Sequence, residues 1–301
     1  MEQDVSNNAL SGLSIQNSDH ITLNWIEVDG IEGTGFTQIY ADDITYNYCD
    51  SHGNGDVQND YEGSNGFDAT ATVNTSTNII YNYCRAWENS DDGWDFFNLG
   101  GIVTLNGCIA FRNGYLPGTL THAGSGDGNG FKLGPGNGNT TTIIRYLNNC
   151  LSFENYLNGF DENYNASHKY PVRMYNCTAY GNDYGFLFLN SDRNHIVTNC
   201  SSLGNTSSQY LFNAEATQTT CSWSGVVTLT TDDYVKTSST GMDGARNAKT
   251  HEYPVTGFLI LKYGSDLIDA GTNVSLPFSG AAPDMNWKES PLQKPKNYRV
   301  R

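Results

Sequence analysis

The sequence has few charged side chains, few apolar ones and no long hydrophobic run. Charged residues make up 16% of the 301 positions and hydrophobic residues 38%, which is below the usual share for a globular domain. No stretch of about 18 apolar residues occurs, so we expect no membrane-spanning helix. The 19 Tyr, 13 Phe and 5 Trp nevertheless argue against disorder, because disordered chains are poor in aromatic residues. We therefore expect a narrow core that needs few apolar residues, as stacked coils have.

Positive charge is scarce as well. The chain carries 16 basic against 32 acidic residues, for a formal net charge of −16. Nucleic acids and anionic membranes bind through clustered Lys and Arg, so this balance disfavours both as partners. An anionic substrate is compatible with it where a cation bridges substrate and protein. No secretory signal follows Met1, and we expect that any such segment has been removed.

What the chain does have is an internal repeat of roughly 21–27 residues, longer where loops intrude at residues 54–64 and 114–129. Each repeat contains short strand-like stretches such as residues 78–81, and no 3.6-residue apolar period occurs. Short strands at a fixed long period predict an all-β parallel β-helix. Two motifs mark the repeat, a Cys with Asn five residues later and a Gly followed by an aromatic residue. They are Cys49/Asn54, Cys84/Asn89, Cys108/Asn113, Cys150/Asn155, Cys177/Asn182 and Cys200/Asn205, and Gly35-Phe36, Gly66-Phe67, Gly93-Trp94, Gly130-Phe131, Gly159-Phe160 and Gly185-Phe186.

We interpret the repeated cysteines and asparagines as architecture. Free Cys behaves as a compact apolar residue, the seven cysteines are odd in number, and no Cys-x-x-Cys pair occurs. One Cys per coil therefore predicts an internal ladder. Buried amides need hydrogen-bond partners, so each Asn is predicted to bond the coils on either side of it.

The ends of the chain differ from its middle. Regular coils are predicted for residues 1–205, and they begin without a capping segment, so we expect N-terminal coils or a cap to be missing. The Cys-to-Asn rule lapses after Asn205. Residues 206–301 are predicted to form irregular final coils and a C-terminal cap of the same domain, because solenoids need capping.

One outer face of the predicted solenoid carries a file of polar residues. If the aromatic residue after Gly points inward, the next residue points outward, and successive coils lie about 4.8 Å apart. Reading that outward position coil by coil gives Asp68, Asp95, Lys132, Asp161 and Leu187.

Acidic and amide oxygens crowd around two adjacent coils of this file. Like charges on neighbouring coils repel each other, and a divalent ion would relieve the repulsion. Hard oxygen ligands suit Ca²⁺, and zinc is not expected because no His or Cys joins the group. The sequence thus predicts a Ca²⁺ site, with a solvated acidic turn as the alternative. The predicted ligands are Asn65, Asp68, Asp91, Asp92 and Asp95.

Lys132 stands in the same file and is the first lysine of the chain. A lone lysine on an exposed strand is usually a solubility residue, but its place beside Asp95 and a predicted metal favours catalysis. The chemistry that fits is β-elimination on a uronic acid. Ca²⁺ would stabilise the charge that develops as the C5 proton leaves, and a neutral amine would act as the base. The metal lowers the lysine pKa and the acidic neighbours raise it, and the sequence leaves open which influence prevails.

These motifs resemble those of polysaccharide lyase family 9, the calcium-dependent pectate and rhamnogalacturonan lyases. The resemblance covers roughly residues 10–205. It is carried by CRAWENSDDGWD at 84–95, GDGNGFKLG at 126–134 and NCLSFENYLNGFDEN at 149–163.

The resemblance implies a right-handed β-helix of the ten-coil type, a secreted enzyme, and a Ca²⁺ site that includes Asp91, Asp92 and Asp95. It also implies that Lys132 is the Brønsted base. The family usually has an Asp-Gly-Phe motif in the preceding coil, whose Asp supplies a metal ligand, whereas this chain has Asn65 there. Asn can still offer its carbonyl oxygen, and Asp68 is expected to replace the lost charge.

The leading hypothesis is a secreted, extracellular Ca²⁺-dependent lyase that cleaves pectin, as polygalacturonate, and acts as a monomer. A periplasmic or cell-surface location is also compatible. The alternatives are a rhamnogalacturonan I lyase and a non-catalytic, glycan-binding or adhesin-like β-helix with a structural calcium. Lys132 discriminates against the last, because a binding module needs no base beside the metal. A hydrolase fits less well, because Asp91 and Asp92 are adjacent and should point apart, whereas glycosidase carboxylates face a common bond.

Three further residues are candidates for substrate binding. Asp161 and Asn163 lie one coil beyond Lys132 and either contact substrate or solvate the strand. Arg112 could clamp a substrate carboxylate, although a surface role is the simpler interpretation.

Overall fold

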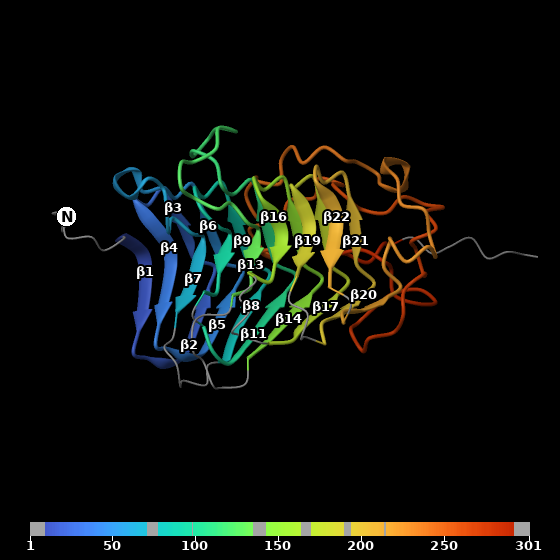
Figure 1. The fold of residues 1–301 in the computed structure, drawn as a ribbon, viewed down its shortest axis with the longest axis horizontal. Coiled ribbons are helices and arrows are strands. Elements are labelled where there is room, and N and C mark those ends of the chain that lie inside the picture. The colour runs from blue at the N-terminus through green and yellow to red at the C-terminus, as the bar shows by residue number, and fades with distance from the viewer. Residues whose placement is uncertain are drawn as a thin grey trace, which may run out of the picture.

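The structure, a computed structural model, describes residues 10–70, 78–97, 99–134, 143–163, 170–189, 194–213 and 215–291. Its strands form three parallel sheets, A, B and C, in which each strand pairs with the equivalent strands of the coils before and after it (Figure 1).

Every coil contributes one strand to each sheet in turn. Sheet A contains β1 (Leu10–Gln16), β4 (Gly33–Ile39), β7 (Phe67–Thr70), β10 (Trp94–Asp95), β13 (Phe131–Lys132), β16 (Asn158–Asp161), β19 (Tyr184–Phe188) and β22 (Ser208–Phe212). Sheet B contains β2 (Asp19–Asn24), β5 (Asp42–Asn47), β8 (Asn78–Asn82), β11 (Ile102–Asn106), β14 (Ile144–Asn148), β17 (Val172–Tyr175), β20 (Ile196–Thr198) and β23 (Thr217–Thr219). Sheet C contains β3 (Glu27–Asp29), β6 (Asp50–His52), β9 (Arg85–Trp87), β12 (Ile109–Phe111), β15 (Leu151–Phe153), β18 (Thr178–Tyr180) and β21 (Ser201–Leu203). Two short 3₁₀ helices, η1 (Val57–Asn59) and η2 (Thr231–Asp233), lie outside the sheets.

The prediction of an all-β parallel β-helix is confirmed. Sheet C has seven strands, so the described residues contain seven complete coils, fewer than the ten-coil type that the resemblance implied. Among the same residues, no helix is both long enough and apolar enough to cross a membrane.

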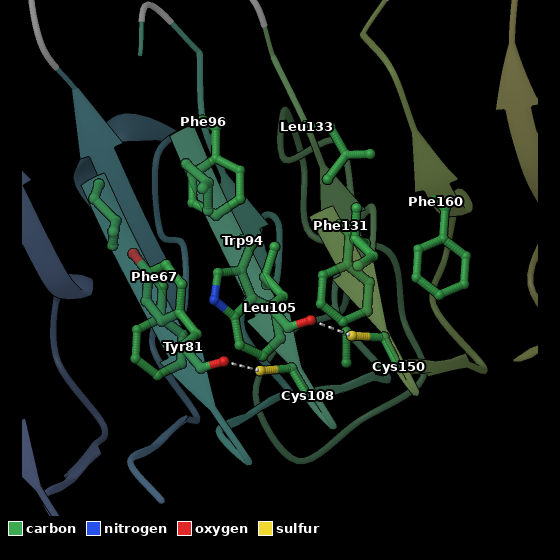
Figure 2. Close-up of a cluster of buried hydrophobic side chains, with 14 of the residues drawn as sticks. Phe67, Tyr81, Trp94, Phe96, Leu105, Cys108, Phe131, Leu133, Cys150 and Phe160 are labelled. Atoms are coloured by element: carbon green, nitrogen blue, oxygen red, sulfur yellow. Dashed lines mark hydrogen bonds between the residues drawn. The ribbon is translucent and has the colours of Figure 1, made fainter. Parts of the chain in front are cut away.

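Inward-facing aromatic residues stack along the core from coil to coil. The ring of Trp94 in β10 packs 4.9 Å from that of Phe67 and 4.7 Å from that of Phe131, centroid to centroid (Figure 2). The same stack continues through Phe160 and Phe186 at spacings of 5.0 Å. Because these spacings match the distance of about 4.8 Å between neighbouring strands, one aromatic per coil fills the core without gaps.

Each coil turns from sheet B to sheet C at one residue with a positive φ. In the later coils this residue is Gly107, Asn149 or Asn176, types that tolerate the left-handed conformation. The cysteine of the repeat follows directly and points into the core. The Sγ of Cys108 lies 3.5 Å from the carbonyl oxygen of Tyr81 in the coil before it (Figure 2).

The predicted cysteine and asparagine ladders are both confirmed. All seven cysteines are free and buried. The asparagines lie in the turn that follows each strand of sheet C. There the Nδ2 of Asn89 donates to the Oδ1 of Asn113 at 2.9 Å, and the Nδ2 of Asn113 donates to the Oδ1 of Asn155 at 2.9 Å. The ladder runs from Asn54 to Asn205 and satisfies buried amides that no water reaches.

The coil pattern continues further than the cysteine spacing suggested. β22 and β23 still pair with sheets A and B, and Cys221 extends the thiol ladder with its Sγ 3.4 Å from the carbonyl oxygen of Val197. Trp223 then packs against Tyr210 at 4.8 Å and Phe186 at 5.3 Å and closes this end of the core.

The segment after Trp223 packs along the outer face of sheet C. Phe258 contacts Phe153, and the guanidinium of Arg246 binds Asp50 in β6, near the opposite end of the solenoid (Figure 1). A second hydrophobic cluster forms between this segment and sheet C. The chain after Trp223 therefore covers one side of the solenoid, while the outer face of sheet A carries the polar file. Residues 1–9 and 292–301, to which the coil and cap predictions also extended, lie outside the described residues.

Candidate active site

The polar file on sheet A has the register that the sequence predicted. Asp68 pairs with Asp95, Asp95 with Lys132, and Lys132 with Asp161 in four neighbouring strands, followed by Leu187. The aromatic residue before each of these is fully buried, so the file faces outward. The structure thus places two acids, a lysine and a further acid on consecutive coils.

A second polar ladder runs just before the glycines and fixes Asp92. The backbone N–H of Asp92 donates to the Oδ1 of Asn65 at 3.0 Å. The Oδ1 of Asp92 accepts from the backbone N–H and the Nδ2 of Asn129 at 2.7 and 2.9 Å. Its Oδ2 is buried and has no hydrogen-bond donor. Asp92 therefore has one oxygen held by Asn129 and one that faces the ammonium group of Lys132.

Asp91 joins two loops to the solenoid. Its Oδ2 accepts from the backbone N–H of Gly63 at 2.8 Å, and its Oδ1 accepts from the backbone N–H of Asp127 at 2.7 Å. Gly63 ends the loop between β6 and β7, and Asp127 belongs to the loop between β12 and β13. Both loops were predicted as insertions in the repeat, and here they meet at one buried carboxylate.

The ammonium group of Lys132 sits among three carboxylates. Its Nζ lies 3.1 Å from the Oδ2 of Asp92, 3.2 Å from the Oδ2 of Asp95 and 3.0 Å from the Oδ2 of Asp127. The side chain is only 13% exposed although its strand faces outward. The carboxylates therefore share one cation, which is the lysine itself.

This crowding shifts the acid–base properties of the whole group. Burial raises the pKa of Asp91 to about 6 and, together with the nearby charge of Asp95, that of Asp68 to about 7. Burial also raises the pKa of Asp92 well above its ordinary value. Burial alone would lower the pKa of Lys132, but the carboxylates of Asp92 and Asp95 raise it above its usual range. In the site as it stands, Lys132 is a firmly protonated counter-ion.

The other sequence candidates are placed differently. Asp68 lies one strand from Asp95, and its Oδ1 accepts from the hydroxyl of Thr70 at 3.2 Å. Asn65 contributes through its hydrogen bond to Asp92. Asp161 accepts from the Nδ2 of Asn158 and the backbone N–H of Asn163 at 2.9 and 2.7 Å, and burial raises its pKa to about 6.

Arg112 lies away from this group. Its guanidinium pairs with Glu88 and with Asp243 of the C-terminal segment, each at 3.2 Å. These contacts place it on the sheet C side of the solenoid, where it helps to hold the C-terminal segment. The structure does not bring it to Lys132.

Asp127 contacts Lys132 but was not among the sequence candidates. Asp127 lies in the GDGNGFKLG motif, five residues before Lys132, and its place in a glycine-rich loop next to the lysine was the available clue.

The donor set fits a hard divalent cation. Carboxylate oxygens of Asp91, Asp92 and Asp127 all lie within 4.8 Å of one another. Oxygen-only ligands in flexible geometry are typical of calcium, and the Oδ2 of Asp92 supplies an oxygen that is paired with the Nζ of Lys132 and with no framework N–H. These residues, with Asp95, could hold such an ion in place of the lysine ammonium.

A protein-family comparison matches residues 2–199 to the family described as Pel9A-like, right handed beta helix region. The matched span contains the polar file, both loops and Lys132. It ends between β20 and β21.

Curated relatives include several proteins named pectate lyase. Pectate lyase L of Dickeya dadantii is 36% identical over 206 residues, which cover 67% of this chain and 46% of that protein. Pectate lyase L of Paenibacillus polymyxa is 30% identical over 238 residues, covering 74% of this chain and 49% of the relative. The chain thus spans about half the length of these relatives.

Solved structures give the same fold. The crystal structure of pectate lyase Pel9A matches with a TM-score of 0.77 at 26% identity, over 92% of this chain and 69% of that one. A rhamnogalacturonan lyase matches with a TM-score of 0.65 at 21% identity, over 83% of this chain and 68% of its own, and shares the fold.

Proposed function

Because the chain belongs to the Pel9A-like family of right-handed β-helix proteins, we propose that it is a Ca²⁺-dependent polysaccharide lyase that cleaves polygalacturonate by β-elimination. The observation that carries the proposal is the position of Lys132. It stands in file with Asp95, and its nitrogen contacts the carboxylates that suit a cation. A glycan-binding module needs no base in file with the metal.

The acidic group is the proposed calcium site, held by Asp91, Asp92 and Asp95. When bound, Ca²⁺ neutralises the carboxylate of the uronic acid and stabilises the negative charge that develops at C5. Asp92 is fixed for this role by Asn129, and Asp91 by two backbone N–H groups, so neither needs to reorganise.

Lys132 is the proposed base that removes the C5 proton. It must be neutral to accept the proton, whereas its carboxylate partners hold it as an ammonium in the metal-free site. A cation on these carboxylates would weaken their hold on the lysine proton and would free the amine for its role. The C5 proton passes to the Nζ of Lys132 and the C4–O bond breaks, which leaves a double bond between C4 and C5. The departing oxygen takes up a proton from water.

The substrate and setting follow from the same proposal. The acidic polymer approaches along the outer face of sheet A, where Asp161 and Asn163 lie one coil beyond the base and are proposed substrate contacts. Pectin is a plant cell-wall polymer, so we propose that the protein acts outside the cell. We further propose that it acts as a monomer, because one chain supplies every group named here.

The unsaturated product absorbs in the ultraviolet, which gives a direct assay. The native protein and Lys132→Ala are compared on polygalacturonate and on rhamnogalacturonan I, with calcium and with a chelator. Lys236→Ala serves as the matched control, because Lys236 is an exposed lysine of the C-terminal segment that bonds the carbonyl oxygen of Thr240.

We expect calcium-dependent product from polygalacturonate, retained in the control and lost by a factor of about 10³ or more in Lys132→Ala, since general bases contribute about 10²–10⁴-fold. Full activity of Lys132→Ala would sink the mechanism, and activity that survives chelation would remove the metal. Product from rhamnogalacturonan I alone would reassign the substrate. No product from either polymer, with binding to one of them, would indicate a glycan-binding module.

A further inference from the structure

The loop between β12 and β13 is built to bring Asp127 against the acidic turn. Asp127 stands between Gly126 and Gly128, and neither position has room for a side chain. A Cβ at Gly126 would lie 2.1 Å from the carbonyl oxygen of Ser90, and one at Gly128 would lie 2.6 Å from the Cα of Gly114. Only glycine allows this close backbone approach, which seats the loop beside the turn that begins at Asp91.

The same loop is fastened at three points. The backbone N–H of Asp127 donates to the Oδ1 of Asp91 at 2.7 Å. Ser125 donates its backbone N–H to the carbonyl oxygen of Asp60 at 2.9 Å and its hydroxyl to the Oδ2 of Asp60 at 2.7 Å. His122 contacts the carbonyl oxygen of Gly126 through its Nε2 at 3.0 Å. The backbone at Asp127 is therefore held by the loop and not by the lysine.

The carboxylate of Asp127 closes the open side of the acidic group. Its side chain is 51% exposed, compared with 13% for Asp95 and 0% for Asp92. Its oxygen lies within 4.8 Å of oxygens of Asp91 and Asp92. A second feature is the buried Oδ2 of Asp92, which accepts no hydrogen bond from the protein framework and lies 3.1 Å from the same lysine nitrogen that Asp127 contacts.

We propose that Asp127 is a direct ligand of the bound cation, so that the site takes four carboxylates, from Asp91, Asp92, Asp95 and Asp127. This inference rests on the calcium site of the proposed function and adds a ligand that comes from a loop rather than from the stacked coils. Asn65 lies beside Asp92 and carries an amide, so that position supplies no negative charge. The fourth negative charge of the site then comes from Asp127. Asp68 was the expected source of that charge, but it lies one strand from Asp95 and accepts a hydrogen bond from the hydroxyl of Thr70.

The test measures calcium binding itself, by calorimetric titration with CaCl₂ after removal of metals with a chelator. Asp127→Asn keeps the size of the side chain and one oxygen but removes its charge. We expect its affinity for calcium to fall by about tenfold or more, since even indirect partners of a metal contribute about 10–100-fold. Asp68→Asn should change the affinity less.

Two further variants test whether a loss of calcium affinity comes from the lost ligand, from the change in net charge or from misfolding. Asp243→Asn removes a carboxylate of similar exposure, 45%, far from the acidic group, and should bind calcium as the native protein does. Gly126→Ala keeps every carboxylate but pushes the loop from the turn, and it should weaken binding as Asp127→Asn does. Circular dichroism in chelator checks that each variant is folded.

The outcomes distinguish the two proposals. Native affinity in Asp127→Asn would overturn the role of Asp127 and leave the lyase proposal intact. An equal loss in Asp243→Asn would reduce the effect to net charge and would also overturn it. No calcium binding by the native protein would contradict both proposals.

Discussion

Lys132 and the proposed metal compete for the same carboxylate oxygens. The oxygens that approach its nitrogen, from Asp92, Asp95 and Asp127, are also among those offered to a metal. Burial of these carboxylates is tolerated because the ammonium neutralises part of their charge. A cation that enters the site must therefore displace the lysine, and calcium affinity includes the cost of breaking these ion pairs.

The neutral variant Lys132→Met should accordingly bind calcium more tightly than the native protein. We expect a gain of about tenfold, equivalent to about 1.4 kcal/mol, because no ammonium then competes for the carboxylates. Calorimetric titration with CaCl₂ measures it, and Lys236→Met is the control. An unchanged or weaker affinity would mean that the lysine and the metal do not compete.

The raised carboxyl pKa values predict how the metal-free protein responds to pH. The pKa is raised to about 7 for Asp68 and to about 6 for Asp91 and Asp161, above the value of about 3.9 expected in the unfolded chain. The folded state then binds more protons than the unfolded state between about pH 4 and pH 7, so stability falls as the pH rises through this range. Lys132 is protonated in both states there and does not alter the slope.

In chelator, the melting temperature should therefore decrease from pH 4 to pH 7 relative to Asp68→Asn, which lacks one of the three groups. Excess calcium should reduce the decrease, because it favours the ionised carboxylates. A melting temperature of Asp68→Asn that follows the native curve over the whole range would contradict the assignment of Asp68.

At the scale of the coil, two asparagine ladders join each coil to its neighbours. Asn113 uses its side chain in both directions, accepting from Asn89 and donating to Asn155 and to the carbonyl oxygen of Ala86. Asn106 belongs to the same coil and forms a similar ladder at the partly exposed end of sheet B, with Asn82 and Asn148. The two residues differ mainly in burial, so they test what a buried amide contributes.

Asn113→Ala should lower the free energy of unfolding by about 2–3 kcal/mol, because it leaves buried partners without a hydrogen bond. Asn106→Ala should cost less than about 1 kcal/mol, because water can replace the lost bond. Urea denaturation measures both. Equal losses would show that the ladder contributes through its repetition rather than through burial.

The stacked coils are also where the sequence was most informative. The offset between Cys and Asn, together with the Gly-aromatic pairs, predicted which residues fall in file, and the strand register from Asp68 to Leu187 agrees with it. A stack of strands has one repeat distance, so a sequence period translates directly into position in space. Loops have no such period. The place of Asp127 therefore depends on backbone contacts at Gly126 and Gly128 that no repeat encodes.

At the scale of the molecule, the outer faces of sheets A and C differ. Sheet C has apolar side chains on its outer face, including Phe111 and Phe153, and the C-terminal segment covers them with Phe258 and Leu261. Asp50 forms ion pairs with both Arg85 of the coils and Arg246 of that segment, which holds the two together. Sheet A carries the polar file on its outer face. The sequence did not predict this arrangement, because residues after 205 have no repeat and their partners are far away in the chain.

Phe258→Ala should destabilise the protein by about 3–5 kcal/mol, as truncation of a buried Phe usually does. Phe258 is 1% exposed and touches Phe153 and Tyr180, whereas Phe278 in the same segment is 38% exposed. Phe278→Ala should therefore cost less than about 1 kcal/mol. Urea denaturation again provides the comparison. A small effect at Phe258 would mean that the segment rests on sheet C without stabilising it.

The thiol ladder also provides a chemical probe of the order in which the coils unfold. Burial raises the pKa of thiols such as those of Cys108 and Cys150, so they resist alkylation in the intact protein. Within the sheets each coil pairs only with its neighbours, so we expect the stack to open by fraying from its ends. The terminal thiols of Cys49 and Cys221 should then be alkylated first and those of the middle coils last. The order of modification would record, coil by coil, how the solenoid comes apart.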